Sequence, residues 1–319
     1  MWMKQNQNYS GCTGDHDSPD GTNSLIWETD VLDAYAHYLS LFVSAYKTHG
    51  INVTAMMVQN EPYADGCNYP KCEWTGAQMR DFVRDHAGPR FAADHADECS
   101  MWLGTLNTDD FLECPNTVLA DVDARKYIGG AALQWAGKGM VQRVQQTFGG
   151  DIPLIQSENE CGDGSNTWDY AMYIFDLMRH YLGNGVVGYT YWNPILNAAN
   201  NGSSYWGWQQ NSMLSVTEDG ALVRNPEYWV FKHFAKFVHP LAVQLDVEGD
   251  WSGSALAFRN KGGDLAVVVM NPHDEPREFK FKHDMDVEGS KEGEAEAGST
   301  GFAVTLEPRS FNTFEVVRA

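Results

Sequence analysis

Basic side chains are scarce in this sequence of 319 residues. It carries 22 Lys and Arg against 43 Asp and Glu, so the formal net charge is −21 with histidine neutral. A surface this anionic repels the phosphates of nucleic acids and the headgroups of acidic membrane leaflets. The composition therefore argues against a nucleic-acid partner and favours a neutral substrate or a cation.

Long apolar runs and cysteines are also few. No stretch approaches the roughly 20 apolar residues of a membrane span, and the first residues do not have the pattern of a signal peptide. Six cysteines are too few for a disulfide-built scaffold in a chain of this length. Cys67 and Cys72 lie close enough in sequence for a small bridge, and the sequence leaves this bridge and two free thiols as equal alternatives.

Several catalytic motifs are missing. The chain contains no H-E-x-x-H, G-x-S-x-G or G-K-[ST] motif, which argues against a zinc protease, a serine esterase and a P-loop ATPase. Residues 183–188 match the dinucleotide pattern G-x-G-x-x-G. They end a predicted helix and begin a predicted strand, whereas a pyrophosphate site needs the glycines after a strand. We interpret them as a helix stop.

The apolar content is sufficient for a large core. Hydrophobic residues make up 43% of the chain, with 11 Trp, 14 Tyr and 15 Phe. Between Asp30 and Pro240 short apolar strands alternate with amphipathic helices, and the predicted strands are 53–58, 102–105, 128–135, 154–157 and 186–192. This alternation predicts parallel crossovers, hence an α/β barrel or an open doubly wound sheet.

Two of the predicted helices have defined boundaries. One begins with a capping box formed by Thr75 and Gln78 and ends at Gly88-Pro89. The other stops at Gly50 and places five apolar residues on one inward face: Tyr35, Leu39, Phe42, Val43 and Tyr46.

The helical period disappears after Pro240. Short β-type runs follow, which predict a small antiparallel β domain. We therefore divide the chain into a barrel domain at 1–239 and a β-sandwich-like domain at 240–319. The acidic segment 288–296 is interpreted as a solvated hairpin connection.

Two predicted strands end in a glutamate, Glu61 after the strand at 53–58 and Glu158 after the strand at 154–157. A carboxylate directly after an apolar strand is partly desolvated, which raises its pKa and suits it to carry a proton near neutral pH. Two intervening strands would place the two side chains on facing walls of a barrel. Two carboxylates in one pocket are what glycoside hydrolysis requires.

The motifs around these glutamates resemble a known family. Asn60-Glu61-Pro62, Ser157-Glu158 and Tyr191-Trp192-Asn193 resemble the clan A glycosidases. The stretches 2–4 and 226–234 are similar to glycoside hydrolase family 30, which includes glucosylceramidases, β-1,6-glucanases and β-xylanases. The resemblance implies a TIM-type (β/α) barrel with a side β-structure, and a retaining double displacement that needs neither a metal nor an organic cofactor.

The resemblance also implies roles for individual residues. Glu61 would be the acid/base and Glu158 the nucleophile, with Glu160 as a rival because Ser157-Glu158-Asn159-Glu160 offers two carboxylates. Asn60 would bind the sugar 2-hydroxyl. The remaining substrate-binding residues would be Trp2, Trp135, Trp192 and Asn193.

Two features depart from the family pattern. Where the glucosylceramidase branch has His-Trp-Tyr, this chain has Gln134-Trp135-Ala136, so the tyrosine that supports the nucleophile is absent. Only one strand, around Trp2 to Lys4, precedes the strand that ends at Glu61, so we expect the first two β/α units of the barrel to be lacking. Either the sequence is a fragment of a longer gene, or the barrel is incomplete with six units. Open strand edges promote association, and we expect a homodimer that covers the gap.

The leading hypothesis is a retaining β-glycosidase that acts on β-glucosides, and a carbohydrate is the expected partner. If the chain is an enzyme with another substrate, the alternative is an endo-β-1,6-glucanase or a β-xylanase. A catalytically inactive carbohydrate-binding remnant is the alternative from another class. Enzymes that resemble this chain are usually secreted, so an extracellular location is expected.

Overall fold

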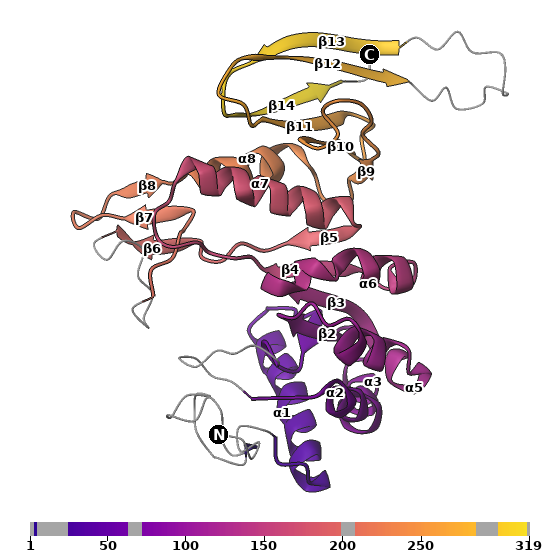
Figure 1. The fold of residues 1–319 in the computed structure, drawn as a ribbon. Coiled ribbons are helices and arrows are strands. Elements are labelled where there is room, and N and C mark those ends of the chain that lie inside the picture. The colour runs from indigo at the N-terminus through magenta and orange to yellow at the C-terminus, as the bar shows by residue number, and fades with distance from the viewer. Residues whose placement is uncertain (1–2, 5–24, 63–71, 199–207, 285–298, 318–319) are drawn as a thin grey trace, which may run out of the picture. The chain divides into compact units, whose positions relative to one another are not determined.

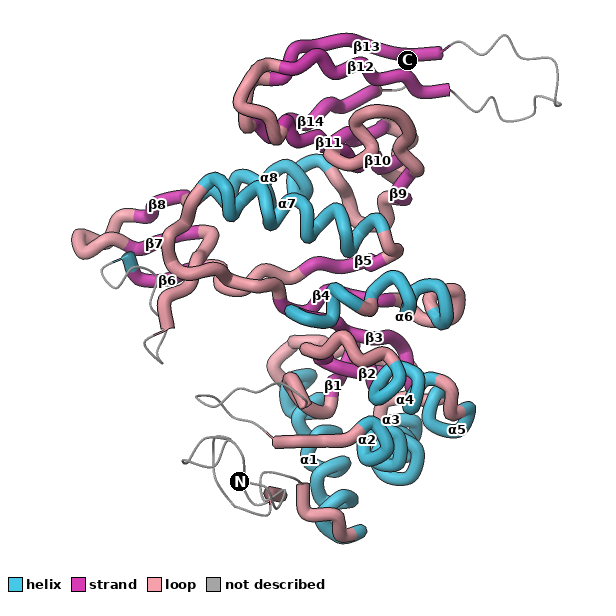
Figure 2. The backbone as a smooth tube through the Cα atoms, in the orientation of Figure 1, coloured by secondary structure: helices cyan, strands magenta, loops and turns pink. Residues whose placement is uncertain are grey.

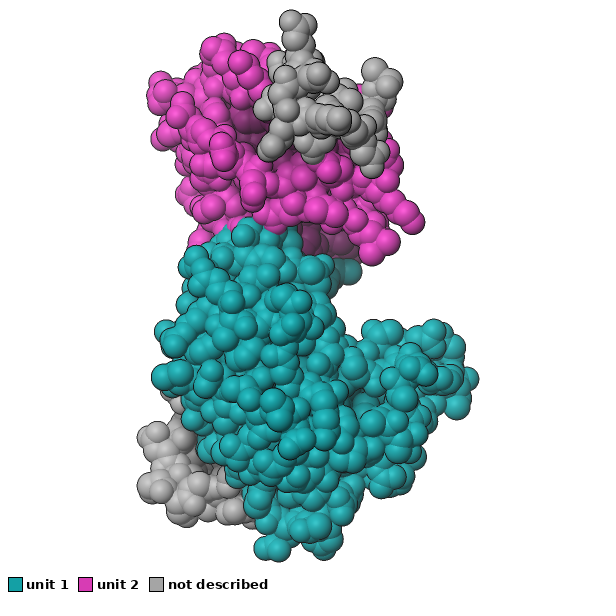
Figure 3. Space-filling view, turned by 90° about the vertical axis from the view of Figure 1, so that its right-hand side faces the viewer, with its two compact units in different colours: residues 1–164, 180–211 teal, residues 165–179, 212–319 magenta. Residues whose placement is uncertain are grey.

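The computed structural model describes residues 3–4, 25–62, 72–198, 208–284 and 299–317. The chain forms two compact units, shown in teal and magenta in Figure 3. Unit 1 consists of Met1–Gly164 and His180–Asn211, and unit 2 consists of Ser165–Arg179 and Ser212–Ala319.

Unit 1 is built on a five-stranded parallel sheet with the strand order β1-β2-β3-β4-β5 (Figure 1). Its strands are β1 (Ala55–Met57), β2 (Ser100–Leu106), β3 (Ile128–Gln134), β4 (Leu154–Glu158) and β5 (Val186–Tyr189). Figure 2 shows helices and strands alternating along this part of the chain. The predicted α/β alternation is confirmed, and β1 and β4 are separated by two strands, as expected for the strands that carry Glu61 and Glu158.

The helical segments of unit 1 connect these strands. They are α1 (Thr29–Thr48), α2 (Gly76–Phe82), η1 (Val83–Ala87), α3 (Gly88–Asp94), η2 (Leu112–Asn116), α4 (Thr117–Leu119), α5 (Val122–Arg125), η3 (Trp135–Gly139) and α6 (Val141–Phe148). The last helix, α7 (Trp168–Gly183), is shared by the two units. Leu39, Phe82, Leu103, Leu133 and Leu154 are buried in the core that these elements form, and burial of each contributes about 1.5–3 kcal/mol.

The capping box at the start of α2 is confirmed. The Thr75 hydroxyl accepts from the backbone N–H of Gln78, and the Gln78 side chain accepts from the backbone N–H of Thr75. The predicted end of this helix at Gly88-Pro89 is wrong. A π-helical turn, η1, leads directly from α2 into α3. Pro89 lies in the first turn of α3, where proline is tolerated.

Helix α1 buries a narrower face than predicted. Tyr35, Leu39 and Val43 face the core, but Phe42 is 38% and Tyr46 is 40% exposed. These two rings stack on each other with centroids 4.3 Å apart. With 3.6 residues per turn, position 42 lies just outside the row formed by 35, 39 and 43. Position 46 falls within that row, but in the last turn of α1, beyond the last buried residue, Val43.

The predicted first strand around Trp2 to Lys4 is not part of the parallel sheet in the described residues. Trp2 lies outside them, and Lys4 forms an isolated antiparallel bridge with Leu25. Within the described part of the chain, β1 is therefore an edge strand that pairs with β2 alone. Cys72 is a buried free thiol, and its suggested partner Cys67 lies outside the described residues.

Unit 2 is rich in antiparallel β-structure. One sheet has the order β14-β11-β10-β9, and a hairpin pairs β12 with β13. The strands are β9 (Val243–Leu245), β10 (Ala255–Arg259), β11 (Leu265–Asn271), β12 (Arg277–Asp284), β13 (Ser299–Leu306) and β14 (Ser310–Val316). The small antiparallel β domain predicted after Pro240 is confirmed. The acidic segment 288–296 lies outside the described residues.

Unit 2 also includes segments that the sequence division assigns to the barrel domain. Helix α8 (Pro226–Phe237) packs against β14 and β11, and the ring of Phe175 in α7 stacks on Phe311 with centroids 5.7 Å apart. These contacts join residues 165–179 and 212–239 to the β-rich unit. Four short strands were not predicted: β6 (Ile195–Asn197), which belongs to unit 1, and β7 (Leu214–Val216), β8 (Leu222–Arg224) and β9 in unit 2.

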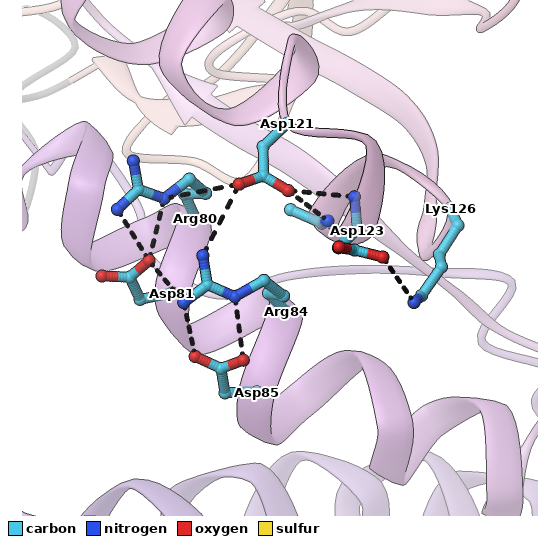
Figure 4. Close-up of polar contacts among 8 residues, drawn as sticks. Arg80, Asp81, Arg84, Asp85, Asp121, Asp123 and Lys126 are labelled. Atoms are coloured by element: carbon cyan, nitrogen blue, oxygen red, sulfur yellow. Dashed lines mark hydrogen bonds and ion pairs between the residues drawn. The ribbon is translucent and has the colours of Figure 1, made fainter.

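A cluster of ion pairs connects α2, η1 and α5 in unit 1 (Figure 4). Arg84 contacts the carboxylates of Asp81, Asp85 and Asp121 at 3.0, 2.7 and 3.5 Å. Asp121 is also the N-cap of α5, and its Oδ1 accepts from the backbone N–H groups of Asp123 and Ala124 at 2.9 Å each. This cluster joins three helical segments through one carboxylate.

Candidate active site

Glu61 follows β1 with a strained backbone and a buried side chain. Its φ is +48°, a left-handed conformation that costs a residue with a side chain about 1–3 kcal/mol. The side chain is 6% exposed, and its Oε1 accepts from Asn107 Nδ2 at 2.8 Å and from Gln134 Nε2 at 3.1 Å. The ends of β2 and β3 thus hold the carboxylate with two neutral amides.

Glu158 is the last residue of β4 and is paired in register with Gln134 of β3. Its Oε1 accepts from the indole Nε1 of Trp135 at 2.8 Å. Burial raises the pKa of Glu158 to about 7, the indole N–H opposes this shift, and the charge of Glu61 adds to it. Glu158 therefore exchanges a proton near neutral pH, as the desolvation argument from the sequence predicts.

Gln134 connects the two strand ends that carry the glutamates. Its amide Nε2 donates to Glu61 Oε1 and, at 3.3 Å, to Asn60 Oδ1, while its Oε1 accepts from the Ser157 hydroxyl at 3.0 Å. The side chain is 1% exposed. Glu61 is thus hydrogen-bonded to Gln134 and Glu158 to the next residue, Trp135, so one pair of consecutive residues contacts both carboxylates.

Trp135 occupies the first position of the turn after β3. Its φ is +46°, so the second residue of the network is also held in the left-handed region. Its indole lies beside that of Trp208, with centroids 5.9 Å apart, and Trp208 is 48% exposed. The two rings present an aromatic surface next to Glu158.

The remaining predicted site residues are distributed around the end of β5. The backbone N–H of Trp192 donates to Asn159 Oδ1 at 2.9 Å, and Asn193 Nδ2 donates to Gln210 Oε1 at 2.9 Å. Asn159 thereby ties the segment after β5 to the end of β4. Trp2, the other predicted aromatic residue, lies outside the described residues.

Glu160, the rival nucleophile, has a different environment. Its Oε1 forms an ion pair with Lys138 Nζ, which comes from the turn after β3. The ammonium group occupies the carboxylate oxygen that an attack on an anomeric carbon would use. Glu158, which is hydrogen-bonded to a neutral indole, is the better candidate.

Asn107, Gln134 and Trp208 were not predicted as site residues. Asn107 directly follows β2 and Gln134 ends β3, so the rule that selected Glu61 and Glu158 also selects these two amides. Trp208 follows no strand of the parallel sheet and carries no such signal. Among the described residues, no group of three or more His, Cys, Asp or Glu side chains is arranged to hold a metal ion.

Comparison with known proteins identifies the family. Residues 1–238 match the model of the glycosyl hydrolase family 30 TIM-barrel domain, and residues 242–314 match that of the glycosyl hydrolase family 30 beta sandwich domain. The chain belongs to glycosyl hydrolase family 30. The family resemblance inferred from the motifs is confirmed, as is the fold of a barrel-type domain followed by a β sandwich.

Relatives within family 30 differ in substrate. The chain is 26% identical over 276 residues to the endo-1,6-beta-D-glucanase neg1 of Aspergillus fumigatus, covering 85% of this chain and 54% of that protein. It is 24% identical over 292 residues to the lysosomal acid glucosylceramidase of Mus musculus, with the same two coverages of 85% and 54%. The chain thus spans about half the length of these curated relatives.

A solved structure supports the fold. SrfJ from Salmonella typhimurium superposes with a TM-score of 0.80 at 22% identity, covering 100% of this chain and 67% of that chain. In the described part of this family 30 chain, no helix is long and apolar enough to cross a membrane.

Proposed function

We propose that the chain is a retaining β-glycosidase that hydrolyses β-glucosides by double displacement. The observation that carries this proposal is the shared network at the strand ends, in which Gln134 and Trp135 hold Glu61 and Glu158 at once. Family membership supplies the reaction class, since family 30 consists of glycoside hydrolases.

The first displacement uses both carboxyl groups together. Glu158, ionised, attacks the anomeric carbon and forms a glycosyl ester, while protonated Glu61 gives its proton to the leaving oxygen as the glycosidic bond breaks. In the second step Glu61, now ionised, takes a proton from a water molecule. That water attacks the anomeric carbon, the ester bond breaks, and Glu158 is released as a carboxylate.

The surroundings of Glu158 suit the role of nucleophile. The indole N–H of Trp135 stabilises the ionised form that attacks. Burial makes the carboxylate poorly solvated and raises its pKa to about 7, so attack on a sugar costs little desolvation. As the pH falls below neutral, Glu158 is protonated, and therefore inactive as a nucleophile, in a growing fraction of the enzyme molecules.

Asn60 and the aromatic side chains would bind the sugar. The Oδ1 of Asn60 accepts from the Thr105 hydroxyl at 2.7 Å and from Gln134, which directs the NH₂ group to other acceptors. We assign it to the 2-hydroxyl of the sugar. Trp135 and Trp192 would line the ring, with Asn193 nearby and the exposed face of Trp208 available to the aglycone side.

A panel of aryl β-glycosides tests this proposal. The unaltered protein is expected to cleave aryl β-D-glucoside, and Glu61→Gln and Glu158→Gln are each expected to lower turnover by about 10³-fold or more. Preference for β-1,6-glucan or xylan would assign the chain to the alternative substrates. Absence of turnover on every β-glycoside would contradict the proposal and favour a carbohydrate-binding remnant.

Self-association across the open edge of β1 is a further part of the proposal. Within the described residues this strand pairs on one side only, and unpaired strand edges favour association. Light scattering at micromolar concentration is expected to give the mass of a dimer, and a monomeric mass would contradict it. Export from the cell stays a prediction that fractionation of the source organism would test.

A further inference from the structure

One amide side chain bridges the two halves of the proposed catalytic network. Asn107, the first residue after β2, donates from Nδ2 to Glu61 Oε1 at 2.8 Å and accepts at Oδ1 from the backbone N–H of Ala136 at 2.9 Å. The two partners fix the orientation of the amide, because a flipped side chain would point its oxygen at the carboxylate and its NH₂ at a backbone N–H.

The turn that contains Ala136 is the one that supports Glu158. Trp135 precedes Ala136, adopts φ +46°, and donates its indole N–H to Glu158. Gly137 follows, and a Cβ built there would lie 2.7 Å from the carbonyl oxygen of Leu106 and 3.2 Å from Leu133 Cβ. The turn is therefore packed against the end of β2, and Asn107 provides its polar connection to that end.

We propose that Asn107 is a positioning residue that sets both carboxylates, Glu61 by direct contact and Glu158 through the turn that carries Trp135. The inference rests on the proposed glycosidase function and extends it. Double displacement needs the proton donor and the nucleophile at one anomeric carbon, and a misplacement of about 1 Å can lower the rate about 10²-fold. The Asn107 amide contacts Glu61 and the turn that carries Trp135. It is therefore suited to keep the distance between the two carboxylates constant.

Two substitutions at Asn107 separate its two contacts. Asn107→Ala removes both hydrogen bonds, so Glu61 loses one of its two amide donors and the turn that carries Trp135 loses its polar connection to the end of β2. Asn107→Asp keeps an oxygen for the Ala136 N–H but replaces the donor to Glu61 with a carboxylate, so of the two hydrogen bonds it removes only the one to Glu61. Asn184→Ala is a matched control, since Asn184 Nδ2 donates to the His180 carbonyl at 2.8 Å outside the site.

The kinetic test compares two aryl β-glucosides. A dinitrophenyl glucoside leaves without acid assistance and reports on attack by Glu158, whereas a phenyl glucoside also needs Glu61. Asn107→Ala is expected to lower kcat/KM about 10- to 10²-fold on both substrates. Asn107→Asp is expected to lower it on the phenyl glucoside and to stay within about threefold of the unaltered protein on the dinitrophenyl glucoside. Full activity of Asn107→Ala on the dinitrophenyl glucoside would overturn the proposal.

A spectroscopic readout keeps the inference testable if the protein cleaves no glycoside. The indole N–H resonance of Trp135, assigned by its loss in Trp135→Phe, reports the bond to Glu158. It is expected to move in Asn107→Ala and to stay in place in Asn107→Asp and Asn184→Ala, with circular dichroism verifying the fold of each variant. An unmoved resonance in Asn107→Ala would refute the positioning role whatever the activity of the chain. No turnover with a moved resonance would refute the glycosidase alone.

Discussion

Asp121 and Glu158 are both hydrogen-bonded carboxylates of unit 1, but their pKa values move in opposite directions. Two backbone N–H groups at the start of α5, with Arg84 and Arg80 nearby, lower the pKa of Asp121. Burial raises the pKa of Glu158 to about 7, against a single indole donor. A carboxylate surrounded by cations and helix N–H groups stays ionised and joins structural elements. One enclosed at a strand end is able to exchange a proton at neutral pH.

The largest expected effect concerns the pH dependence of activity. Because Glu158 must be ionised to attack, kcat/KM for an activated aryl glucoside is expected to rise with pH through about 7. Trp135→Phe removes the donor that favours the ionised form, so this acid limb should move upward by about one pH unit, which is about a tenfold loss at low pH. Initial rates from about pH 5 to 9 measure it. An acid limb that moves downward in Trp135→Phe would contradict the role of the indole.

A smaller effect is expected at the ion-pair cluster of Figure 4. Asp121→Ala removes the N-cap of α5 and the carboxylate that faces Arg84 and Arg80. The free energy of unfolding should fall by about 1–2 kcal/mol near neutral pH, with activity unchanged. Because the pKa of Asp121 is lowered in the folded state, this contribution is present above the ordinary aspartate range and disappears as the pH falls below about 4.

Urea unfolding at two pH values measures this difference. Asp123→Ala is the control, since the Asp123 carboxylate forms an exposed ion pair with Lys126. Its free energy of unfolding should change by less than about 0.5 kcal/mol. An equal loss in the free energy of unfolding for Asp121→Ala and Asp123→Ala would show that the contacts of Asp121 with α5 and the two arginines do not stabilise the fold.

The smallest expected effect is a gain in thermal stability for Glu158→Gln. The folded state raises the pKa of Glu158, so its stabilising contribution is present below the ordinary glutamate range and is lost as the pH rises through about 7. A glutamine never ionises and still accepts from the indole. The variant should therefore melt about 2–4 °C higher than the unaltered protein near pH 8 and at the same temperature near pH 4.5. A lower Tm at the higher pH would contradict the assigned cost of ionisation.

The features of the fold that the sequence predicted are those with a local signal. The five strands of unit 1 are apolar runs, and the capping box of α2 consists of two residues three positions apart, Thr75 and Gln78. The continuation of the helix through Gly88 had no such signal, because Gly-Pro normally marks the end of a helix, whereas here a π-helical turn leads into α3 with Pro89 in its first turn. Strands β7 and β8 have three residues each, too few for a period to appear.

Those residues of the candidate site that lie at or just after the end of a predicted strand could be predicted from the sequence. Glu61 and Glu158 were selected by this rule, and their proposed roles stay predictions. The bridge through Asn107 depends on the lateral alignment of β2 with the turn after β3, and a sequence does not specify which side chains meet across strands. Glu61 and Trp135 adopt left-handed backbone conformations. Glycine or asparagine usually occupies such positions, so the residue types at 61 and 135 did not indicate these conformations.

The contact between Trp135 and Glu158 gives the molecule an intrinsic optical probe. Indole emission responds to the charge of a neighbouring carboxylate, and Trp135 is adjacent to the partly exposed Trp208. A change in the ionisation of Glu158, or a sugar ring placed against these indoles, is therefore expected to alter the fluorescence of the unlabelled protein. Occupancy of the site could then be followed in real time, even in variants too slow for a turnover assay.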